Sequence, residues 1–339
     1  MELGEKTKPL VESLEFRQVN FSVNLRAHEA KTNGGVKTKE VLHGVSGALK
    51  AGELMALMGP SGSGKTTLLN AMFMAQQGTL SSPLGTLTSG EVLVNGMAPS
   101  KASSAKAGFV FQDDLLLSSL TVRETVAYSA ALRLPQSFSD TQRSERVEGV
   151  IAALRLGDCA ETMVGSVIRR GVSGGERKRT AVACELVTRP GMLLMDEPTS
   201  GLDATSALSV VTVLSELAQT TGLLLICSIH QPRWSVFSLF DKLQLLSSGS
   251  TVFSGATVSQ SWALLPPSAL DLTSSCHVMS INLIHCSDEF RNSVPVRPYL
   301  SRLLSCLYIL AWHCSPLGIP GTRATALHQC RRLDTGYSG

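Results

Sequence analysis

The sequence has 339 residues, a length that allows two domains and few more. Hydrophobic residues make up 43% and charged residues 17%, proportions that permit a buried core and exclude collagen-like and wholly disordered chains. The formal charge of +3 is too small to indicate a nucleic-acid partner, and the polar N-terminus predicts no secretory signal peptide and therefore a cytosolic chain.

The first third of the chain reads as strands around one glycine-rich loop. Residues 1–40 form a predicted polar N-terminal segment in which the first strand begins at about residue 14. A Gly/Ser/Thr/Pro-rich loop is predicted over 75–90, and Asn95-Gly96 marks a hairpin turn. Apolar patterns predict strands at 41–49, 54–58 and 91–94, and a helix at 65–74.

A mostly helical insert is predicted over residues 115–190. Two capping boxes set helix starts inside it, one from Thr121 to Glu124 and one from Ser173 to Glu176. Around the insert, apolar runs predict strands at 108–111, 191–195 and 223–229, a helix at 203–220 and a hairpin at 241–253. Strands that alternate with helices predict an α/β fold with a largely parallel sheet.

One loop carries the clearest chemical motif of the sequence. Residues 59–66, the phosphate loop, match G-x-x-x-x-G-K-[ST] at every fixed position, between a predicted strand and a predicted helix. Glycine lets backbone N–H groups wrap a phosphate at the helix N-terminus, Lys65 reaches the outer phosphates, and Thr66 ligates Mg²⁺. The loop therefore predicts a nucleoside triphosphate site, whose residues are Gly59, Pro60, Ser61, Gly62, Ser63, Gly64, Lys65, Thr66 and Thr67.

Hydrolysis needs a carboxylate that holds the metal and a group that activates water. The apolar run 192–195 ends in Asp196 and Glu197. Asp196 is predicted to hold the Mg²⁺ shell, and Glu197 is predicted to be the general base. An acidic pair at a strand end is common by itself, but the phosphate loop upstream favours the catalytic interpretation.

A second glycine motif narrows the class of nucleotide-binding protein. The SGGE motif (Ser173, Gly174, Gly175 and Glu176) stands at a helix N-terminus and forms a second anion site. Such a site is better suited to a nucleotide held by a second, facing domain than to the nucleotide of its own chain. The neighbouring basic residues are interpreted as a solvated face, because no aromatic residues interleave them as in a nucleic-acid site; they are Arg169, Arg170, Arg177, Lys178 and Arg179.

Taken together, these motifs resemble a known family over about residues 10–255. The phosphate loop, the SGGE motif and the Asp196-Glu197 pair are joined by Gln112, Asp203 and His230. The set is similar to the ATP-binding cassette of ABC transporters, and the residues in these motifs most resemble those of the white-type half-transporters of subfamily G. The resemblance implies an ABC-type P-loop NTPase core over 41–255, with a mostly parallel sheet and flanking helices, an antiparallel β part and a helical signature subdomain at about 115–190.

The resemblance also implies roles and partners. ATP and Mg²⁺ are the expected ligands, and each ATP would lie between one chain's phosphate loop and the SGGE motif of a second cassette, in a homodimer or a heterodimer. Gln112 would contact Mg²⁺ and the attacking water, Asp203 would cross the dimer interface, and His230 would hold the γ-phosphate and position Glu197. Nucleic acid is not expected as a partner.

The sequence departs from the family pattern in two places. No aromatic residue that could stack on adenine lies between Phe21 and the phosphate loop, and Phe21 itself is expected to pack in the core. Residues 256–339 form a divergent tail in which neither a membrane span nor a standard zinc pattern is found. The chain is therefore interpreted as truncated before the membrane domain, with a tail that is poorly ordered. The tail holds Cys276, Cys286, Cys306, Cys314 and Cys330.

The leading hypothesis is the ATP-hydrolysing domain of a subfamily G exporter of lipid-like or xenobiotic substrates. It would act at the cytoplasmic face of a membrane, where a half-transporter partner supplies the membrane domain. One alternative is a soluble ABC ATPase outside transport, against which the absence of coiled coils and of a second cassette argues. Another is a dominant-negative partner that dimerises with full-length half-transporters.

Overall fold

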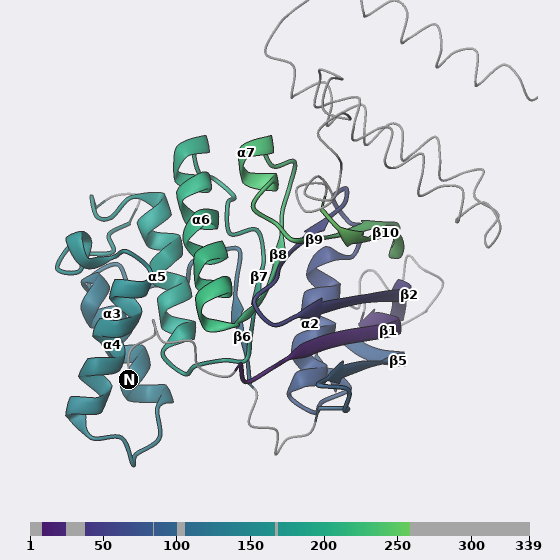
Figure 1. Ribbon diagram of the computed structural model, residues 1–339, viewed down its shortest axis with the longest axis horizontal. Coiled ribbons are helices and arrows are strands. Elements are labelled where there is room, and N and C mark those ends of the chain that lie inside the picture. The colour runs from purple at the N-terminus through teal and green to yellow at the C-terminus, as the bar shows by residue number, and fades with distance from the viewer. Residues whose placement is uncertain (1–8, 25–37, 84, 100–105, 167–168, 258–339) are drawn as a thin grey trace, which may run out of the picture. The chain divides into compact units, whose positions relative to one another are not determined.

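The computed structural model describes residues 9–24, 38–83, 85–99, 106–166 and 169–257. Two β-sheets and several helices make up this part of the chain (Figure 1). The larger sheet has six strands in the order β10-β9-β3-β8-β7-β6, and the smaller has four in the order β2-β1-β5-β4. Predictions that concern residues 258–339, including the poorly ordered tail, lie outside the described residues.

The smaller sheet is antiparallel throughout. Its first strand begins at Ser13, close to the predicted residue 14, and pairs with β2 and β5, so the N-terminal segment supplies the middle of this sheet. Phe21 is 1% exposed and packs in the hydrophobic core, as expected. The strands are β1 (Ser13–Asn24), β2 (Thr38–Lys50), β4 (Ser81–Ser82) and β5 (Gly85–Val94).

The loop predicted over 75–90 is wrong in its second half. Strand β5 already starts at Gly85, where its backbone pairs with β1, and it ends at the predicted Asn95-Gly96 turn. Polar residues fill the middle of β5, so its apolar pattern is visible only over the last three residues. Backbone pairing with an established strand therefore outweighs the turn-forming composition here.

Parallel pairing dominates the larger sheet, as predicted. Strand β3 pairs in parallel with β8 and β9, and β7 pairs in parallel with β6 and β8, while β10 closes the sheet as an antiparallel hairpin with β9. Every residue of β3, β6, β7 and β8 is buried, which is typical of strands covered on both faces. The strands are β3 (Leu54–Met58), β6 (Ala107–Val110), β7 (Met192–Met195), β8 (Leu224–Ser228), β9 (Lys242–Ser247) and β10 (Ser250–Ala256).

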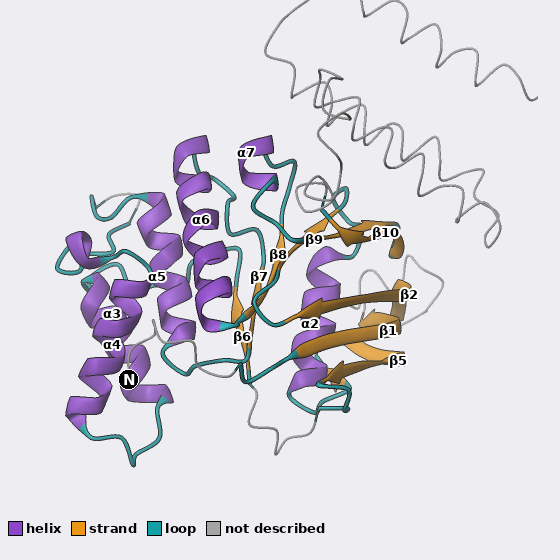
Figure 2. Ribbon diagram, viewed as in Figure 1, coloured by secondary structure: helices purple, strands orange, loops and turns teal. Residues whose placement is uncertain are grey.

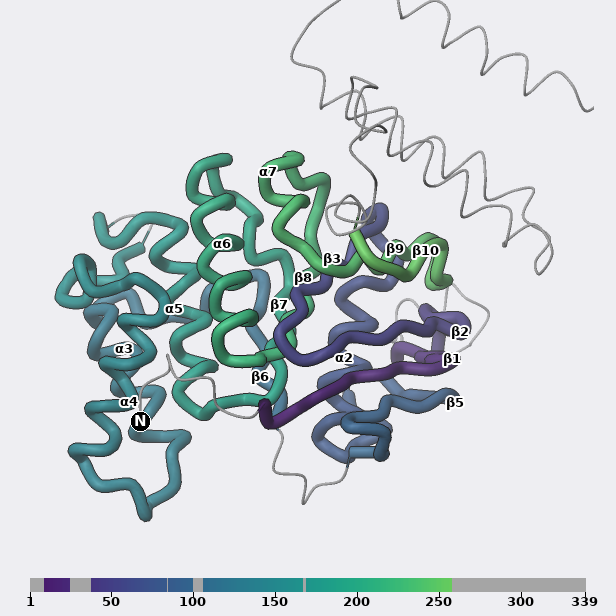
Figure 3. Tube along the Cα trace, in the orientation of Figure 1, coloured from purple at the N-terminus to yellow at the C-terminus, as the bar shows by residue number. Residues whose placement is uncertain are grey.

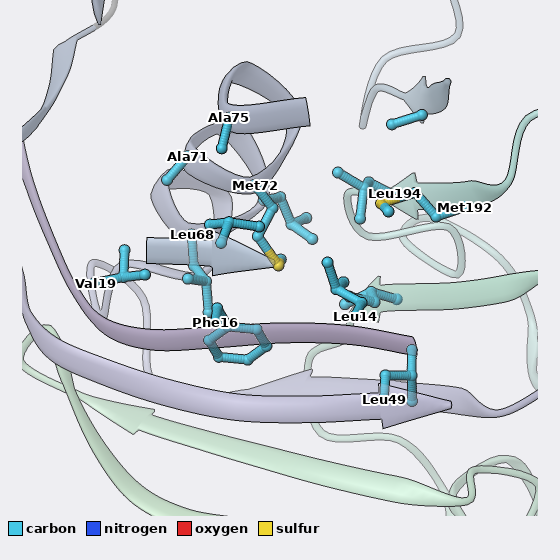
Figure 4. Packing of buried hydrophobic residues seen from close by; sticks show 14 of the residues in the cluster. Leu14, Phe16, Val19, Leu49, Leu68, Ala71, Met72, Ala75, Met192 and Leu194 are labelled. Atoms are coloured by element: carbon cyan, nitrogen blue, oxygen red, sulfur yellow. The ribbon is translucent and has the colours of Figure 1, made fainter. Parts of the chain in front are cut away.

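Helix α2 (Lys65–Gln76) lies between the two sheets and packs against strands of both (Figure 2). Its apolar residues Leu68 and Met72 join Phe16 of β1 and Leu194 of β7 in one core cluster (Figure 4). Fully burying one such side chain is worth about 1.5–3 kcal/mol. The packing of α2 against both sheets therefore holds its N-terminus, which directly follows the phosphate loop, in place.

Three helices and a 3-10 turn make up the helical part between β6 and β7. The predicted capping boxes at Thr121 and Ser173 are both present, and a third joins Ser139 to Gln142, which the sequence analysis missed. This part contains α3 (Val122–Arg133), α4 (Asp140–Ala153), η1 (Gly157–Cys159) and α5 (Gly174–Leu186). Helix α5 packs against α3 on one side and against α6 and β6 on the other, so it joins the helical part to the larger sheet.

The remaining helices complete the layers beside the larger sheet (Figure 3). Helix α6 (Ala204–Thr221) covers β3 and β8. Asp203, the predicted start of the helix, caps its N-terminus, and Gly222 caps its C-terminus with a left-handed backbone that is typical of this position. The short α7 (Trp234–Phe237) packs against α6. Among the described residues, none of the helices combines the length and the apolar character that crossing a bilayer requires.

Candidate active site

The phosphate loop turns the chain from the end of β3 into the start of α2. A Cβ atom on Gly59 would fall 2.3 Å from the carbonyl oxygen of Leu246 and 2.6 Å from Oγ of Ser63, so only glycine fits there. Gly64 precedes the helix with φ of 98°, in the left-handed region that glycine tolerates. The loop therefore has the close-packed backbone that a phosphate cradle requires.

The other loop residues divide between surface and interior. Pro60, Ser61, Gly62 and Thr66 are exposed, and Thr67 is intermediate. Ser63 is 2% exposed, and its hydroxyl has no hydrogen-bond partner within the described part of the chain. An unpaired buried hydroxyl is costly, and a phosphate oxygen would provide the partner that this one lacks.

Lys65 is buried where the loop meets α2. Its ammonium donates hydrogen bonds to the carbonyl oxygens of Gly59 (3.0 Å) and Pro60 (3.1 Å). Burial lowers the pKa of Lys65 below its ordinary value, while the carboxylates of Glu197 and Asp196 act in the opposite direction. The amine is thus held by weak neutral acceptors, which a phosphate oxygen can readily replace.

Asp196 follows β7, and each of its carboxylate oxygens accepts a hydrogen bond from a hydroxyl. Oδ2 accepts from Oγ1 of Thr66 (2.8 Å), and Oδ1 accepts from Oγ of Ser228 (2.5 Å). Ser228, which is fully buried at the end of β8, also accepts a hydrogen bond from the backbone N–H of Glu197 (2.8 Å). Thr66 and Asp196, which the sequence predicts as Mg²⁺ ligands, thus lie in direct contact, and Ser228 ties the acidic pair to the neighbouring strand.

The carboxylate of Glu197 is contacted by side chains that follow two other strands. Nε2 of Gln112 donates to its Oε2 (3.1 Å), and Nε2 of His230 lies 3.1 Å from its Oε1. Gln112 follows β6, Glu197 follows β7 and His230 follows β8, so parallel pairing brings the three strand ends to one edge of the sheet. The Glu197 side chain is 19% exposed, and its backbone is left-handed, with φ of 48°.

The SGGE motif is placed differently from the rest of the site. It begins α5, and the carboxylate of Glu176 accepts hydrogen bonds from the backbone N–H (2.7 Å) and the hydroxyl (2.8 Å) of Ser173. The first of these bonds is the main cause that lowers the pKa of Glu176. Ser173 and Gly174 are exposed, whereas Gly175 is buried and faces Ser206 of α6.

Asp203 is also exposed, and its carboxylate accepts hydrogen bonds from the backbone N–H groups of Thr205 (3.0 Å) and Ser206 (3.2 Å). A side-chain hydrogen bond to Ser206 is the main cause that lowers the pKa of Asp203, and the two backbone bonds add to it. Within one chain this residue therefore caps α6. Its predicted crossing to a second chain stays a prediction.

The donor set at the sheet edge fits Mg²⁺ and a triphosphate. A hydroxyl, a carboxylate and a side-chain amide oxygen are the hard oxygen ligands that Mg²⁺ takes, and here they come from Thr66, Asp196 and Gln112. The N-terminus of α2 and the Lys65 ammonium supply positive charge for the phosphates. These features agree with the ligands predicted from the sequence.

Two residues of this region were missed or misread from the sequence. Ser228 gave no signal beyond being a polar residue at the end of an apolar run. Lys178 was interpreted as part of a solvated basic face, but it is 5% exposed, and its ammonium donates to the carbonyl oxygen of Gln112 (2.6 Å) and to Oδ1 of Asp114 (3.0 Å). The interpretation as a solvated residue is therefore wrong for Lys178. The local sequence could not reveal its burial, because its acceptors lie more than sixty residues away in the chain.

Comparison with known sequences points to one family. Residues 42–200 match the family described as ABC transporter. ABC transporter G family member 22 of Arabidopsis thaliana is 45% identical over 252 residues, which are 74% of this chain and 32% of that protein. A probable ATP-dependent permease of Saccharomyces cerevisiae is 44% identical over 244 residues, which are 72% of this chain and 22% of the permease. The chain thus spans a third or less of the length of these two relatives.

Solved structures show the same fold. The protein cbiO1 from Clostridium perfringens, described as part of the ABC transporter complex cbiONQ, has a TM-score of 0.58 at 21% identity, over 75% of this chain and 91% of its own. An ATP-binding cassette described as a dimer bound to ADP and phosphate has a TM-score of 0.54 at 22% identity, over 72% of this chain and 98% of its own. The fold class predicted from the sequence is confirmed.

Proposed function

We propose that this chain is the ATP-binding cassette of an ABC transporter of subfamily G, and that it binds ATP with Mg²⁺ and hydrolyses it to drive transport through a membrane partner. The observation that carries the proposal is the convergence of Gln112 and His230 on the Glu197 carboxylate, beside the Asp196 carboxylate at the phosphate loop. Binding alone would need the loop, but it would not need a half-buried carboxylate held from two sides.

In the proposed reaction, different residues bind the phosphates, hold Mg²⁺ and accept the proton of water. Backbone N–H groups of the phosphate loop and the Ser63 hydroxyl would hold phosphate oxygens, and Lys65 would exchange its carbonyl acceptors for the outer phosphates. Thr66, Asp196 and Gln112 would hold Mg²⁺, which when bound neutralises charge on the phosphates. Glu197 would accept the proton of the attacking water.

His230 would orient both the base and the terminal phosphate. Its Nε2 already lies beside one oxygen of Glu197, and its side chain is 42% exposed, so the other faces of the ring remain open to a ligand. Gln112 holds the second oxygen of Glu197, which leaves the carboxylate oriented from both sides. Such preorganisation lowers the cost of aligning base and water in the transition state.

A second cassette completes the site in this proposal. The exposed Ser173 and Gly174 leave the first backbone N–H groups of α5 open to an anion. Within one chain, α5 packs mainly against α3, α6 and β6, whereas α2 packs against strands of both sheets. The SGGE motif would therefore cap the ATP bound to the phosphate loop of a second copy or of a related chain. Asp203 would contribute to the same interface.

Transport requires a membrane domain, which we propose that a half-transporter partner supplies. The subfamily G relatives support this assignment, and export of lipid-like or xenobiotic substrates is the proposed outcome. The cassette would then work at the cytoplasmic face of the membrane, where it is held by its partner.

The decisive experiment measures ATP hydrolysis by the purified chain over a wide range of protein concentrations. Turnover per chain should rise with concentration, because two chains form each composite site, and it should vanish in Glu197→Gln, which keeps nucleotide binding. ATP binding without turnover at any concentration, also with a half-transporter partner present, would overturn the assignment as a hydrolase.

A further inference from the structure

Lys178 is a buried cation that the proposed chemistry does not use. It lies on α5, the helix that begins in the SGGE motif, about one turn after the first residue Gly174, and only 5% of it is exposed. The Asp114 carboxylate, 3.0 Å from Nζ, is 10% exposed. Burying such an ion pair is costly and adds little net stability. Its role therefore lies in the chain segment that Lys178 holds in position.

The main chain of Gln112 is what Lys178 fixes. The Lys178 ammonium donates to the Gln112 carbonyl oxygen at 2.6 Å, while the side-chain amide of the same Gln112 donates to Glu197 at 3.1 Å. Gln112 is itself exposed, so its own packing does not immobilise it. The buried lysine therefore holds one end of the residue whose other end orients the general base.

The opposite side of Gln112 is attached to the larger sheet. The ring of Phe111, one residue before, packs on the ring of Phe109 in β6 with centroids 4.8 Å apart, and Phe109 in turn contacts Phe73 of α2 at 5.5 Å. Gln112 is thus the joint between this aromatic row and the helical part. A shift of α5 would act on the joint through Lys178.

Helix α5 also carries the SGGE motif, which faces the second cassette in the proposed dimer. Arg177, the neighbour of Lys178, donates to the carbonyl oxygens of Val164 and Gly165, both at 2.9 Å, so the first turns of α5 are braced against the preceding loop. Gly174 of the SGGE motif and Lys178 lie about 6 Å apart along the axis of one continuous helix. Displacement of one end therefore moves the other.

We propose that Lys178 is a positioning residue that couples the placement of the SGGE helix to the Gln112–Glu197 contact. A nucleotide of the second cassette that docks on the SGGE motif would set α5, and Lys178 would then set the base of this chain's own site. The inference rests on the proposed hydrolysis, and it adds to it a link between the two composite sites.

The test compares Lys178→Met with Lys178→Arg and with a control variant, Arg133→Met. Arg133 of α3 forms a more exposed ion pair with Glu185 of α5, at 2.7 Å, and also donates to the carbonyl oxygen of Cys184. Lys178→Met should lower kcat about 10- to 100-fold, as small misplacements of catalytic groups do, and change the Kd for ATP less than twofold. Lys178→Arg should recover much of the loss, and Arg133→Met should retain kcat within about threefold of the parent.

A double-mutant cycle separates positioning from general destabilisation. If Lys178 acts through Gln112, then Lys178→Met combined with Gln112→Ala should be no slower than Gln112→Ala alone. Multiplying effects, or a kcat for Lys178→Met within twofold of the parent, would overturn the proposal. Should Lys178→Met fail to fold, Lys178→Met with Asp114→Leu removes both buried charges, and the same fall in kcat is expected of it.

Hydrogen exchange distinguishes failure of this inference from failure of the proposed function. In the nucleotide-free chain, Lys178→Met should speed amide exchange over residues 111–116 about tenfold, while Arg133→Met leaves this segment unchanged. If the parent chain proves unable to hydrolyse ATP, the proposed function falls, and unchanged exchange in Lys178→Met would then overturn the link to Gln112 as well.

Discussion

Asp196 accepts hydrogen bonds from two hydroxyls that differ in burial, and this contrast predicts unequal costs for removing them. Ser228 is fully buried and serves both Asp196 and the backbone N–H of Glu197, whereas Thr66 is exposed and serves Asp196 alone. Ser228→Ala leaves a buried carboxylate oxygen and a backbone N–H without partners. Thr66→Val lets water take the place of the lost hydroxyl.

The magnitudes follow from the two bonds of Ser228. A hydrogen bond to a charged group contributes about 1.5–3 kcal/mol and a neutral one about 0.5–1.5 kcal/mol, so Ser228→Ala should lower the free energy of unfolding by about 2–4 kcal/mol. For a domain of this size that corresponds to a fall of about 4–15 °C in Tm. Thr66→Val should cost less than about 1 kcal/mol.

Thermal and urea unfolding of the nucleotide-free chain measure both variants side by side. For ATP affinity the order of the two variants should be the reverse of that for stability. Thr66→Val removes a proposed Mg²⁺ ligand and should weaken Mg²⁺-dependent ATP binding at least tenfold, which a binding assay measures. Equal stability losses in the two variants, or a loss below about 0.5 kcal/mol for Ser228→Ala, would refute the account of the Asp196 network.

Three further predictions concern the loop, the helix cap and the cysteines. Gly59→Ala should destabilise by more than about 2 kcal/mol, since its Cβ would fall 2.3 Å from a carbonyl oxygen, whereas Gly62→Ala, in open space at φ of 76°, should cost about 1–2 kcal/mol; equal Tm values for the two would contradict this. The lowered pKa of Glu176 contributes stability above its unfolded pKa of about 4.3 that is lost as pH falls through the folded pKa. Glu176→Gln, which retains the capping box, should therefore make the free energy of unfolding fall less steeply as the pH is lowered below about 5, as urea titrations at several pH values would show. An unchanged dependence on pH would rule out this contribution. Burial raises the pKa of Cys184 to about 12 and also raises that of Cys227. Iodoacetamide at pH 8 should therefore label the fully buried Cys227 only after denaturation and the partly buried Cys184 far more slowly than in the denatured chain, as peptide mapping would show; rapid labelling of Cys227 in the native chain would contradict this.

Local patterns account for most of what the sequence could predict. The phosphate loop and the capping boxes at Thr121 and Ser173 each lie within a few consecutive residues, so the spacing of residue types is enough to locate them. The apolar runs predicted the strands of the larger sheet, and their parallel pairing brings Gln112, Glu197 and His230 to one edge, but the order of the strands within the sheet was not predicted.

What the sequence could not show depends on distance along the chain. Ser228 meets Asp196 from 32 residues away, and Lys178 meets Gln112 from 66 residues away, so neither contact leaves a periodic trace. The early start of β5 was hidden for a related reason: its polar half is held by backbone pairing with β1, which composition does not reveal.

The central position of β3 also determines the order in which the chain can assemble during its synthesis. Both neighbours of β3 in the sheet are made late, and Leu54 pairs with Leu225, about 170 residues further on. At roughly 5–20 residues per second, the ribosome takes about 10–35 s to supply that partner. The antiparallel strands β1, β2 and β5 and helix α2 need only the first 94 residues and can meet much earlier. Strand β3, apolar along its whole length, waits unpaired on the nascent chain, and the phosphate loop attached to it takes its final shape only after most of the domain has left the ribosome.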